Sequence, residues 1–169
     1  MKLYLLRHGE ADPVTKKLTP KGELQAKETA GFLNTLKIDK IYSSTMERAI
    51  QTATFLGKSF EQRSELNEIY RVIVKGPIKE GTPEDREEKD RKRADKFWEE
   101  VSKEKKNILL VCHGNIIRYY LNKMGSDIIW ENELQPCSLS MIENDNIRVI
   151  NYVDHLPEHL RSPRAKKLD

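Results

Sequence analysis

Short apolar runs divide the chain into segments that predict buried strands. Residues 2–6 (KLYLL) and 107–112 (NILLVC) are almost wholly apolar, which is typical of strands buried on both faces of a parallel sheet. Weaker patterns predict further strands at 40–43, near Glu65-Leu66, at 137–142 and at 147–153. The last two flank Asn144-Asp145-Asn146, a sequence that favours a tight turn between the strands of a hairpin.

Helical periodicity fills the stretches between these strands. Thr19 can cap a helix whose first position is Pro20, where the missing N–H costs no hydrogen bond. Ser44 and Glu47 form the S-x-x-E pattern of a capping box, which predicts a second helix that begins there and stops at Gly57. Apolar residues at helical spacing predict two more helices, at 84–106 and from 116 to about 124.

The predicted helix at 84–106 carries nine acidic and nine basic residues, so its net charge is zero. Ala94, Phe97 and Val101 nevertheless recur at helical spacing, with Trp98 beside them. We therefore expect one face of this helix to pack against the protein and the other face to carry mixed charges in water. A neutral helix with packed aromatic residues does not indicate a nucleic-acid partner.

Strands that alternate with helices predict an α/β fold, a three-layer α/β/α sandwich with a mostly parallel central sheet. A length of 169 residues fits a single domain over 1–169. We expect its basic tail, about 155–169, to be partly frayed, with His155 and His159 in solvent. No apolar run approaches the roughly 20 residues that cross a bilayer, which excludes a membrane-embedded protein.

Charge and cysteine content narrow the function classes further. A net charge of +3 is too small to indicate a nucleic-acid binder. Cys112 and Cys137 are too few for a disulfide framework, and the N-terminus lacks the pattern of a signal peptide, so we expect a cytoplasmic protein. Because no metal-ligand spacing is visible, we expect neither a metal nor another cofactor. The sequence leaves the oligomeric state open.

Two predicted strands are each followed by a histidine. Arg7 and His8 follow the strand at 2–6, and His113 follows the strand at 107–112. In parallel α/β sheets ligands bind at the carboxyl ends of the strands, so these side chains should meet at one edge. Each histidine precedes a glycine, which would let a ligand approach the backbone.

Arg48, near the start of the helix after a third strand, adds another cation to this edge. Two arginines and two histidines around one crevice supply the fixed donors that a phosphoryl dianion binds. The predicted helix N-termini beside Ser44 and Asn115 add partial positive charge, and we expect Asn115 to contact the phosphate. These residue types favour a phosphate-binding site.

Four segments together resemble the histidine phosphatase superfamily, whose branch 1 contains phosphoglycerate mutase-like proteins. They are RHGEA at 7–11, LTPKGELQA at 18–26, SSTMERAIQTA at 43–53 and VCHGN at 111–115. The resemblance covers about residues 2–153 and implies a phosphoglycerate mutase-like fold. The compact length and the sequence NYVDHLPEHLR near the C-terminus are similar to those of the short, mutase-like protein Ser/Thr phosphatases.

The resemblance also implies roles for individual residues. His8 matches the nucleophile that becomes phosphorylated, and Arg7 and Arg48 match the arginines that clamp the phosphate. His113 matches the second histidine of the phosphate pocket, and Glu68 lies in a segment similar to the one that carries the proton donor. The implied activity is metal-independent hydrolysis of phosphomonoesters, on small molecules or phosphoproteins, through a phosphohistidine intermediate.

Three alternatives stay open beside this hypothesis. Family mutases are longer and carry an asparagine where this chain has Val14, so hydrolysis is favoured over phosphoglycerate mutase activity. A module that binds phosphate without catalysis is the second alternative. The third is a tyrosine phosphatase with Cys112 as nucleophile, because Cys112 and Arg118 have C-x5-R spacing. That chemistry leaves the other predicted site residues without a function, and we expect the Cys112 side chain to point away from the pocket.

Overall fold

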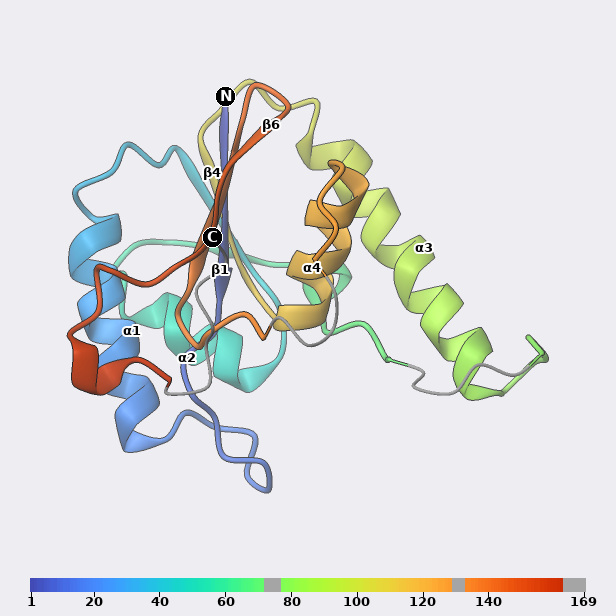
Figure 1. The fold of residues 1–169 in the computed structure, drawn as a ribbon, viewed down its shortest axis with the longest axis horizontal. Helices are drawn as coiled ribbons and strands as arrows, with labels where there is room; N and C mark the ends of the chain where they lie inside the picture. Colours follow the sequence, from blue (N-terminus) through green and yellow to red (C-terminus); the bar gives the residue numbers. More distant parts are fainter. Residues whose placement is uncertain (72–76, 129–132, 163–169) are drawn as a thin grey trace.

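A mixed sheet forms the centre of the computed structural model, which describes residues 1–71, 77–128 and 133–162 (Figure 1). Within these residues the strand order is β3-β2-β4-β1-β5-β6. Strands β1 to β4 run parallel, whereas β5 is antiparallel to β1 and β6 is antiparallel to β5. The strands are β1 (Lys2–Arg7), β2 (Lys40–Ser43), β3 (Glu61–Gln62), β4 (Ile108–Cys112), β5 (Leu139–Glu143) and β6 (Asn146–Tyr152).

Helices cover both faces of this sheet, as Figure 1 shows, so the expected three-layer sandwich is confirmed. Helices α1 (Pro20–Leu33) and α2 (Glu47–Thr54) pack on one face. Helices α3 (Pro83–Val101) and α4 (Gly114–Lys123) pack on the other. Two short 3-10 helices, η1 (Ser64–Leu66) and η2 (Glu158–Leu160), complete the described elements. No helix among the described residues is long and apolar enough to cross a membrane.

Strand β4 lies between these two helical layers and is buried along its whole length. Leu110 and Cys112 face the α3 and α4 side, whereas Leu109 and Val111 face the α1 and α2 side. Both faces therefore need apolar side chains, which explains the continuous apolar run of this strand. Thr19 caps α1 as expected, since its side chain accepts a hydrogen bond from the Gly22 N–H.

The predicted start of α2 is wrong by two residues. Its N-cap is Met46, whose side chain makes no capping hydrogen bond. Ser44 lies before the helix: its hydroxyl accepts from the N–H of the N-cap residue Met46 at 3.1 Å, donates to Asn67 and lies 2.8 Å from a ring nitrogen of His113. The strand predicted near Glu65-Leu66 is also wrong. The chain forms the 3-10 helix η1 there, and the pairing with β2 comes earlier, at β3.

The predicted helix at 84–106 and the predicted tail both differ from the structure. Helix α3 ends at Val101, the last residue of its apolar stripe, and the chain then turns back into β4. His155 is not in solvent: its Nε2 lies 3.0 Å from the Thr29 hydroxyl, and its ring stacks on Phe32. The buried side chain of Leu156 anchors this segment. His159 is exposed as expected, and residues 163–169 of the tail lie outside the described residues.

Candidate active site

Strands β1 and β4 bring the two predicted histidines together. The strands pair in parallel with Arg7 opposite Cys112, so the residues that follow them are neighbours. The His8 N–H donates to the Cys112 carbonyl at 3.0 Å. The centroids of the His8 and His113 rings are 5.1 Å apart, with the rings edge to face. His8 and His113, more than a hundred residues apart in sequence, thus lie side by side at one edge of the sheet.

His8 presents one ring nitrogen as a lone pair. Its Nδ1 lies 2.7 Å from the Gly9 carbonyl, which can only accept, so Nδ1 carries the ring proton. Nε2 is therefore unprotonated, and the Arg48 Nε–H donates to it at 2.9 Å. Burial of the ring, together with the Arg7 and Arg48 charges, lowers the pKa of His8 to about 3. A neutral imidazole with an unprotonated Nε2 has the form that a nucleophile requires.

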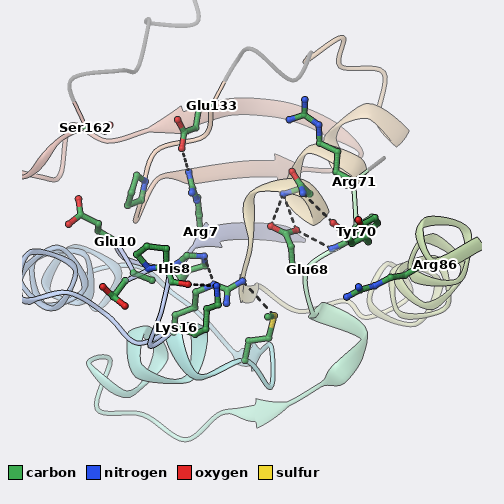
Figure 2. A pocket seen from close by; sticks show the side chains of 18 residues that line it. Arg7, His8, Glu10, Lys16, Glu68, Tyr70, Arg71, Arg86, Glu133 and Ser162 are labelled. Atoms are coloured by element: carbon green, nitrogen blue, oxygen red, sulfur yellow. Dashed lines mark hydrogen bonds and ion pairs between the residues drawn. The ribbon is translucent and has the colours of Figure 1, made fainter. Parts of the chain in front are cut away.

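The two predicted arginines approach His8 from different elements. Arg48 comes from the first turn of α2, and its guanidinium also lies 3.6 Å from the Met46 sulfur. Arg7 ends β1 and donates to the Leu134 carbonyl, while its Nη1 lies 3.3 Å from a Glu133 carboxylate oxygen (Figure 2). Both guanidiniums line the same cavity as His8. This arrangement provides two fixed cations beside an unprotonated imidazole nitrogen.

The glycine after His8 packs closely against α1. A Cβ on Gly9 would lie 2.6 Å from the Gly22 carbonyl oxygen in α1, closer than real Cβ atoms approach. A Cβ on Gly22 would in turn overlap the Glu10 carbonyl oxygen. The two glycines therefore let the loop after β1 lie directly against α1, and the approach of a ligand to the backbone beside His8 stays a prediction.

His113 is completely buried and, unlike His8, is not one of the residues that line the cavity. Its Nε2 is 2.8 Å from the Ser44 hydroxyl oxygen. Its Nδ1 is buried and has no hydrogen-bond partner among the described residues. Burial first, and then the charges of His8, Arg48 and Arg7, lower the pKa of His113 well below its usual range. His113 is therefore neutral in the free protein.

Glu68 lies at the N-terminus of α4 and lines the cavity. Its carboxylate accepts hydrogen bonds from the backbone N–H groups of Asn115 at 3.1 Å, Ile116 at 3.2 Å and Ile69 at 3.1 Å. Burial raises the pKa of Glu68, and these backbone bonds oppose the rise. A carboxyl group with a raised pKa in a cavity can both give and take a proton.

Asn115 lines the cavity, but its side chain is occupied by contacts within the protein. Its Nδ2 donates to the Ile69 carbonyl at 3.2 Å, and its Oδ1 accepts from Arg118 at 3.1 Å. These bonds join α4 to the segment that carries Glu68. A contact between Asn115 and phosphate stays a prediction.

A cavity of about 810 Å³ opens beside His8 (Figure 2). It is far larger than a single phosphoryl group requires, and charges of both signs surround it. Most of the residues that line it could not be predicted from the sequence, because the packing of loops around a cavity leaves no local sequence pattern. The charged lining residues are Arg7, Glu10, Asp12, Lys16, Arg48, Glu68, Arg71, Arg86 and Glu133.

Cys112 points away from this cavity, as expected. It belongs to the core cluster between β4 and the α3 and α4 layer, and it is fully buried. Burial raises the pKa of the Cys112 thiol far above neutrality, so the thiolate that a cysteine nucleophile needs does not form. Among the described residues no group of histidine, cysteine and carboxylate side chains is arranged to hold a metal ion, and the expectation of a metal-independent reaction stays a prediction.

The sequence of the chain matches a known protein family and several characterised proteins. The model of the histidine phosphatase superfamily (branch 1) matches residues 3–91 and 80–150. The human 6-phosphofructo-2-kinase/fructose-2,6-bisphosphatase 4 is 41% identical over 76 residues, which are 40% of this chain and 16% of that protein. The mouse 6-phosphofructo-2-kinase/fructose-2,6-bisphosphatase 1 is 28% identical over 160 residues, 75% of this chain and 34% of that protein. The chain thus spans about a third or less of these relatives.

Solved structures share the fold along almost their whole length. Phosphoglycerate mutase from Thermus thermophilus superposes with a TM-score of 0.68 at 24% identity, covering 91% of this chain and 100% of that one. A phosphoserine phosphatase from Entamoeba histolytica superposes with a TM-score of 0.67 at 20% identity, covering 92% and 99%. At these identities the likeness concerns the fold.

Proposed function

The chain belongs to the histidine phosphatase superfamily (branch 1), and on that premise we propose that it hydrolyses phosphomonoesters through a phosphohistidine formed on His8. The observation that carries the proposal is the unprotonated Nε2 of His8, which faces the Arg48 guanidinium at 2.9 Å beside a large cavity. A phosphoryl group that enters between the two side chains replaces their mutual hydrogen bond with contacts to both. The arginines then neutralise its charge without a metal ion.

The proposed reaction has two displacements. His8 Nε2 attacks phosphorus in line, so that a P–N bond forms while the bond to the ester oxygen breaks. Protonated Glu68 gives its proton to the leaving oxygen, and the alcohol departs. Glu68 then takes a proton from water as the water oxygen attacks the phosphohistidine, which releases inorganic phosphate and restores His8. Arg7 and Arg48 stabilise the charge on the phosphoryl oxygens in both steps, and His113 lies beside them as the second histidine of the phosphate pocket.

The proposed substrates are phosphorylated small molecules or exposed phosphorylated side chains of proteins. A cavity of about 810 Å³ supports this range, because it leaves room for a sizeable group beyond the phosphate. Names of the matching proteins, among them fructose-2,6-bisphosphatase and phosphoserine phosphatase, point in the same direction.

The test combines turnover with isolation of the intermediate. Wild-type protein should hydrolyse p-nitrophenyl phosphate, and a panel of phosphoserine, phosphothreonine, phosphotyrosine, 3-phosphoglycerate and sugar phosphates should identify preferred substrates. A rapid quench with radiolabelled substrate should trap an adduct that is stable to base and labile to acid, as a phosphoramidate is. His8→Ala should abolish turnover and adduct, whereas His159→Ala, at an exposed histidine, should change neither. Phosphate binding without turnover at any pH would favour a binding module instead.

A further inference from the structure

A hydrogen-bonded chain of three side chains reaches His113, and two of its members, Ser44 and Asn67, have no assigned role. It runs from Asn67, which directly precedes Glu68, through Ser44 at the end of β2 to His113 at the end of β4. Ser44 and His113 are each fully buried. Because every polar atom in such a chain needs a compatible partner, the positions of its protons can be worked out one after another.

The Thr45 backbone fixes the orientation of the Asn67 amide. The backbone N–H of Thr45 points to the Asn67 side chain at 3.0 Å, and a backbone N–H can only donate. The Asn67 atom that it meets must therefore be the oxygen, Oδ1. The same oxygen lies 2.7 Å from the Ser44 hydroxyl and 2.9 Å from the Thr45 hydroxyl. Since a carbonyl oxygen cannot donate, Ser44 gives its single proton to Asn67.

The Ser44 hydroxyl in turn fixes the position of the proton on His113. With its proton committed, the Ser44 oxygen can only accept further bonds. It accepts one from the Met46 backbone N–H at 3.1 Å, and it faces His113 Nε2 at 2.8 Å. His113 must therefore carry a proton on Nε2. This tautomer is the opposite of that of His8, where Nδ1 holds the proton and Nε2 is unprotonated.

We propose that Ser44 and Asn67 are positioning residues that hold the proton of His113 on Nε2, so that Nδ1 is the atom that meets the transferred phosphoryl group. This inference rests on the proposed phosphatase function. Nδ1 is buried without a partner among the described residues, an arrangement that costs free energy unless a ligand completes it. The ring also lies 5.1 Å from that of His8, where the phosphoryl group would be attached.

The tautomer has a consequence for the charge state of the ligand. A neutral His113 with its proton on Nε2 offers only a lone pair at Nδ1, and a phosphoryl dianion also offers only lone pairs. Their contact therefore requires one added proton, carried in by a monoanionic ligand or taken up from solvent. The charged and titratable groups around His113 are Arg7 at the end of β1, His8 directly after it, Arg48 from α2 and Arg93 from α3, and the cations among them oppose a positive His113.

The first experiment reads the proton directly and needs no turnover. Protein with ¹⁵N-labelled histidine should give His113 ring signals of the Nε2–H tautomer, assigned with a His113→Asn variant. Ser44→Ala removes the acceptor at Nε2, and the His113 signals should then shift toward the Nδ1–H tautomer or a mixture. Thr45→Ala is the matched control, because it removes another donor to Asn67 but leaves the contact between Ser44 and His113 in place. Unchanged His113 signals in Ser44→Ala would overturn the proposal.

The second experiment measures the inhibition constant of inorganic phosphate against pH. In wild-type protein the affinity should fall about tenfold for each pH unit above the second pKa of phosphate, because binding takes up one proton. Ser44→Ala should flatten this dependence and lower kcat/KM on the order of 10- to 100-fold, as expected when a group is misoriented. Thr45→Ala should keep the wild-type slope, and an equal slope in Ser44→Ala would contradict the inference.

Two further variants keep the test decisive if Ser44→Ala fails to fold. Asn67→Asp retains an oxygen that accepts from Ser44 and should keep the Nε2–H tautomer. Asn67→Ala frees the Ser44 hydroxyl to turn toward His113, so the tautomer should become mixed. If both variants gave the wild-type His113 signal, Asn67 would have no positioning role. An inactive wild-type protein with the predicted tautomers would instead refute the phosphatase proposal while leaving the proton positions established.

Discussion

His8 and His113, at neighbouring strand ends, carry their ring protons on different nitrogens because a different acceptor lies beside each ring. A carbonyl oxygen faces His8 Nδ1, and a hydroxyl oxygen whose proton is committed faces His113 Nε2. Each contact holds one proton on the ring, so the two imidazoles offer opposite nitrogens. As a result, the unprotonated Nε2 of His8 faces Arg48, and the Nδ1 of His113 is buried without a partner among the described residues.

Arg48 should matter most of the side chains that we propose to bind phosphate, because it already occupies the position next to His8 Nε2. Arg48→Ala should lower kcat about 10²- to 10³-fold, the usual effect of losing one preorganised donor. Steady-state kinetics with p-nitrophenyl phosphate checks this. Arg148→Ala, at an arginine in β6 that pairs with Glu143, is the control and should leave kcat unchanged. A small effect in Arg48→Ala would remove this residue from the mechanism.

Glu68 should show its role through the leaving group. If it protonates the departing oxygen, Glu68→Gln should slow hydrolysis of an alkyl phosphate by about 10²- to 10⁴-fold. The same variant should affect the first step with p-nitrophenyl phosphate much less, since p-nitrophenolate leaves without a proton. The comparison is made by single-turnover kinetics on the two substrates. Equal losses on both would indicate that Glu68 only supports the start of α4, where it accepts from backbone N–H groups.

At the scale of elements, much of the fold could be predicted and the exceptions have physical causes. Apart from their first residues, the runs KLYLL and NILLVC are apolar at consecutive positions. A short run of that kind is typical of a strand covered on both faces. The start of α2 could not be predicted, because Ser44 bonds to Asn67 and His113, which lie far away in sequence. His155 was likewise unpredictable, since its partners Thr29 and Phe32 belong to α1.

The packing of the loop after β1 on α1 can be tested with two glycines of the same helix. Gly22→Ala places a Cβ on top of the Glu10 carbonyl oxygen, so the loop must shift, and we expect a loss of about 1–3 kcal/mol in the free energy of unfolding. Gly31→Ala meets nothing within 4 Å and should stabilise the helix by about 0.5–1 kcal/mol. Urea denaturation followed by circular dichroism measures both. If Gly22→Ala were as stable as wild type, the close approach would not matter for the fold.

At the scale of the whole molecule, the site is assembled from segments that do not meet along the chain. Strands β1, β2 and β4 each end at the same edge, and α2, α4 and the segment after η1 bring further side chains to it. Gln25 of α1 joins the loop after β1 to the 3-10 helix η2, because it accepts from the Glu10 N–H at 2.8 Å and donates to the Leu160 carbonyl at 2.7 Å. Burial of histidines is a consequence of this assembly, and it makes global stability depend on pH.

Stability should fall as the pH drops from about 6.5 toward 4, and His155 should account for part of the loss. Burial lowers the pKa of His155 to about 4, whereas the unfolded chain has the usual value of 6.5. Between these values the unfolded state binds a proton that the folded state does not, so acid favours unfolding. His8 acts in the same direction, with a pKa of about 3.

Urea denaturation of wild type at pH 7.5 and pH 5 should show the difference in the free energy of unfolding. His155→Gln, which cannot titrate, should reduce the difference without abolishing it, and His159→Gln at an exposed site should leave it unchanged. An identical pH dependence in His155→Gln and wild type would mean that the His155 ring is protonated in the folded protein.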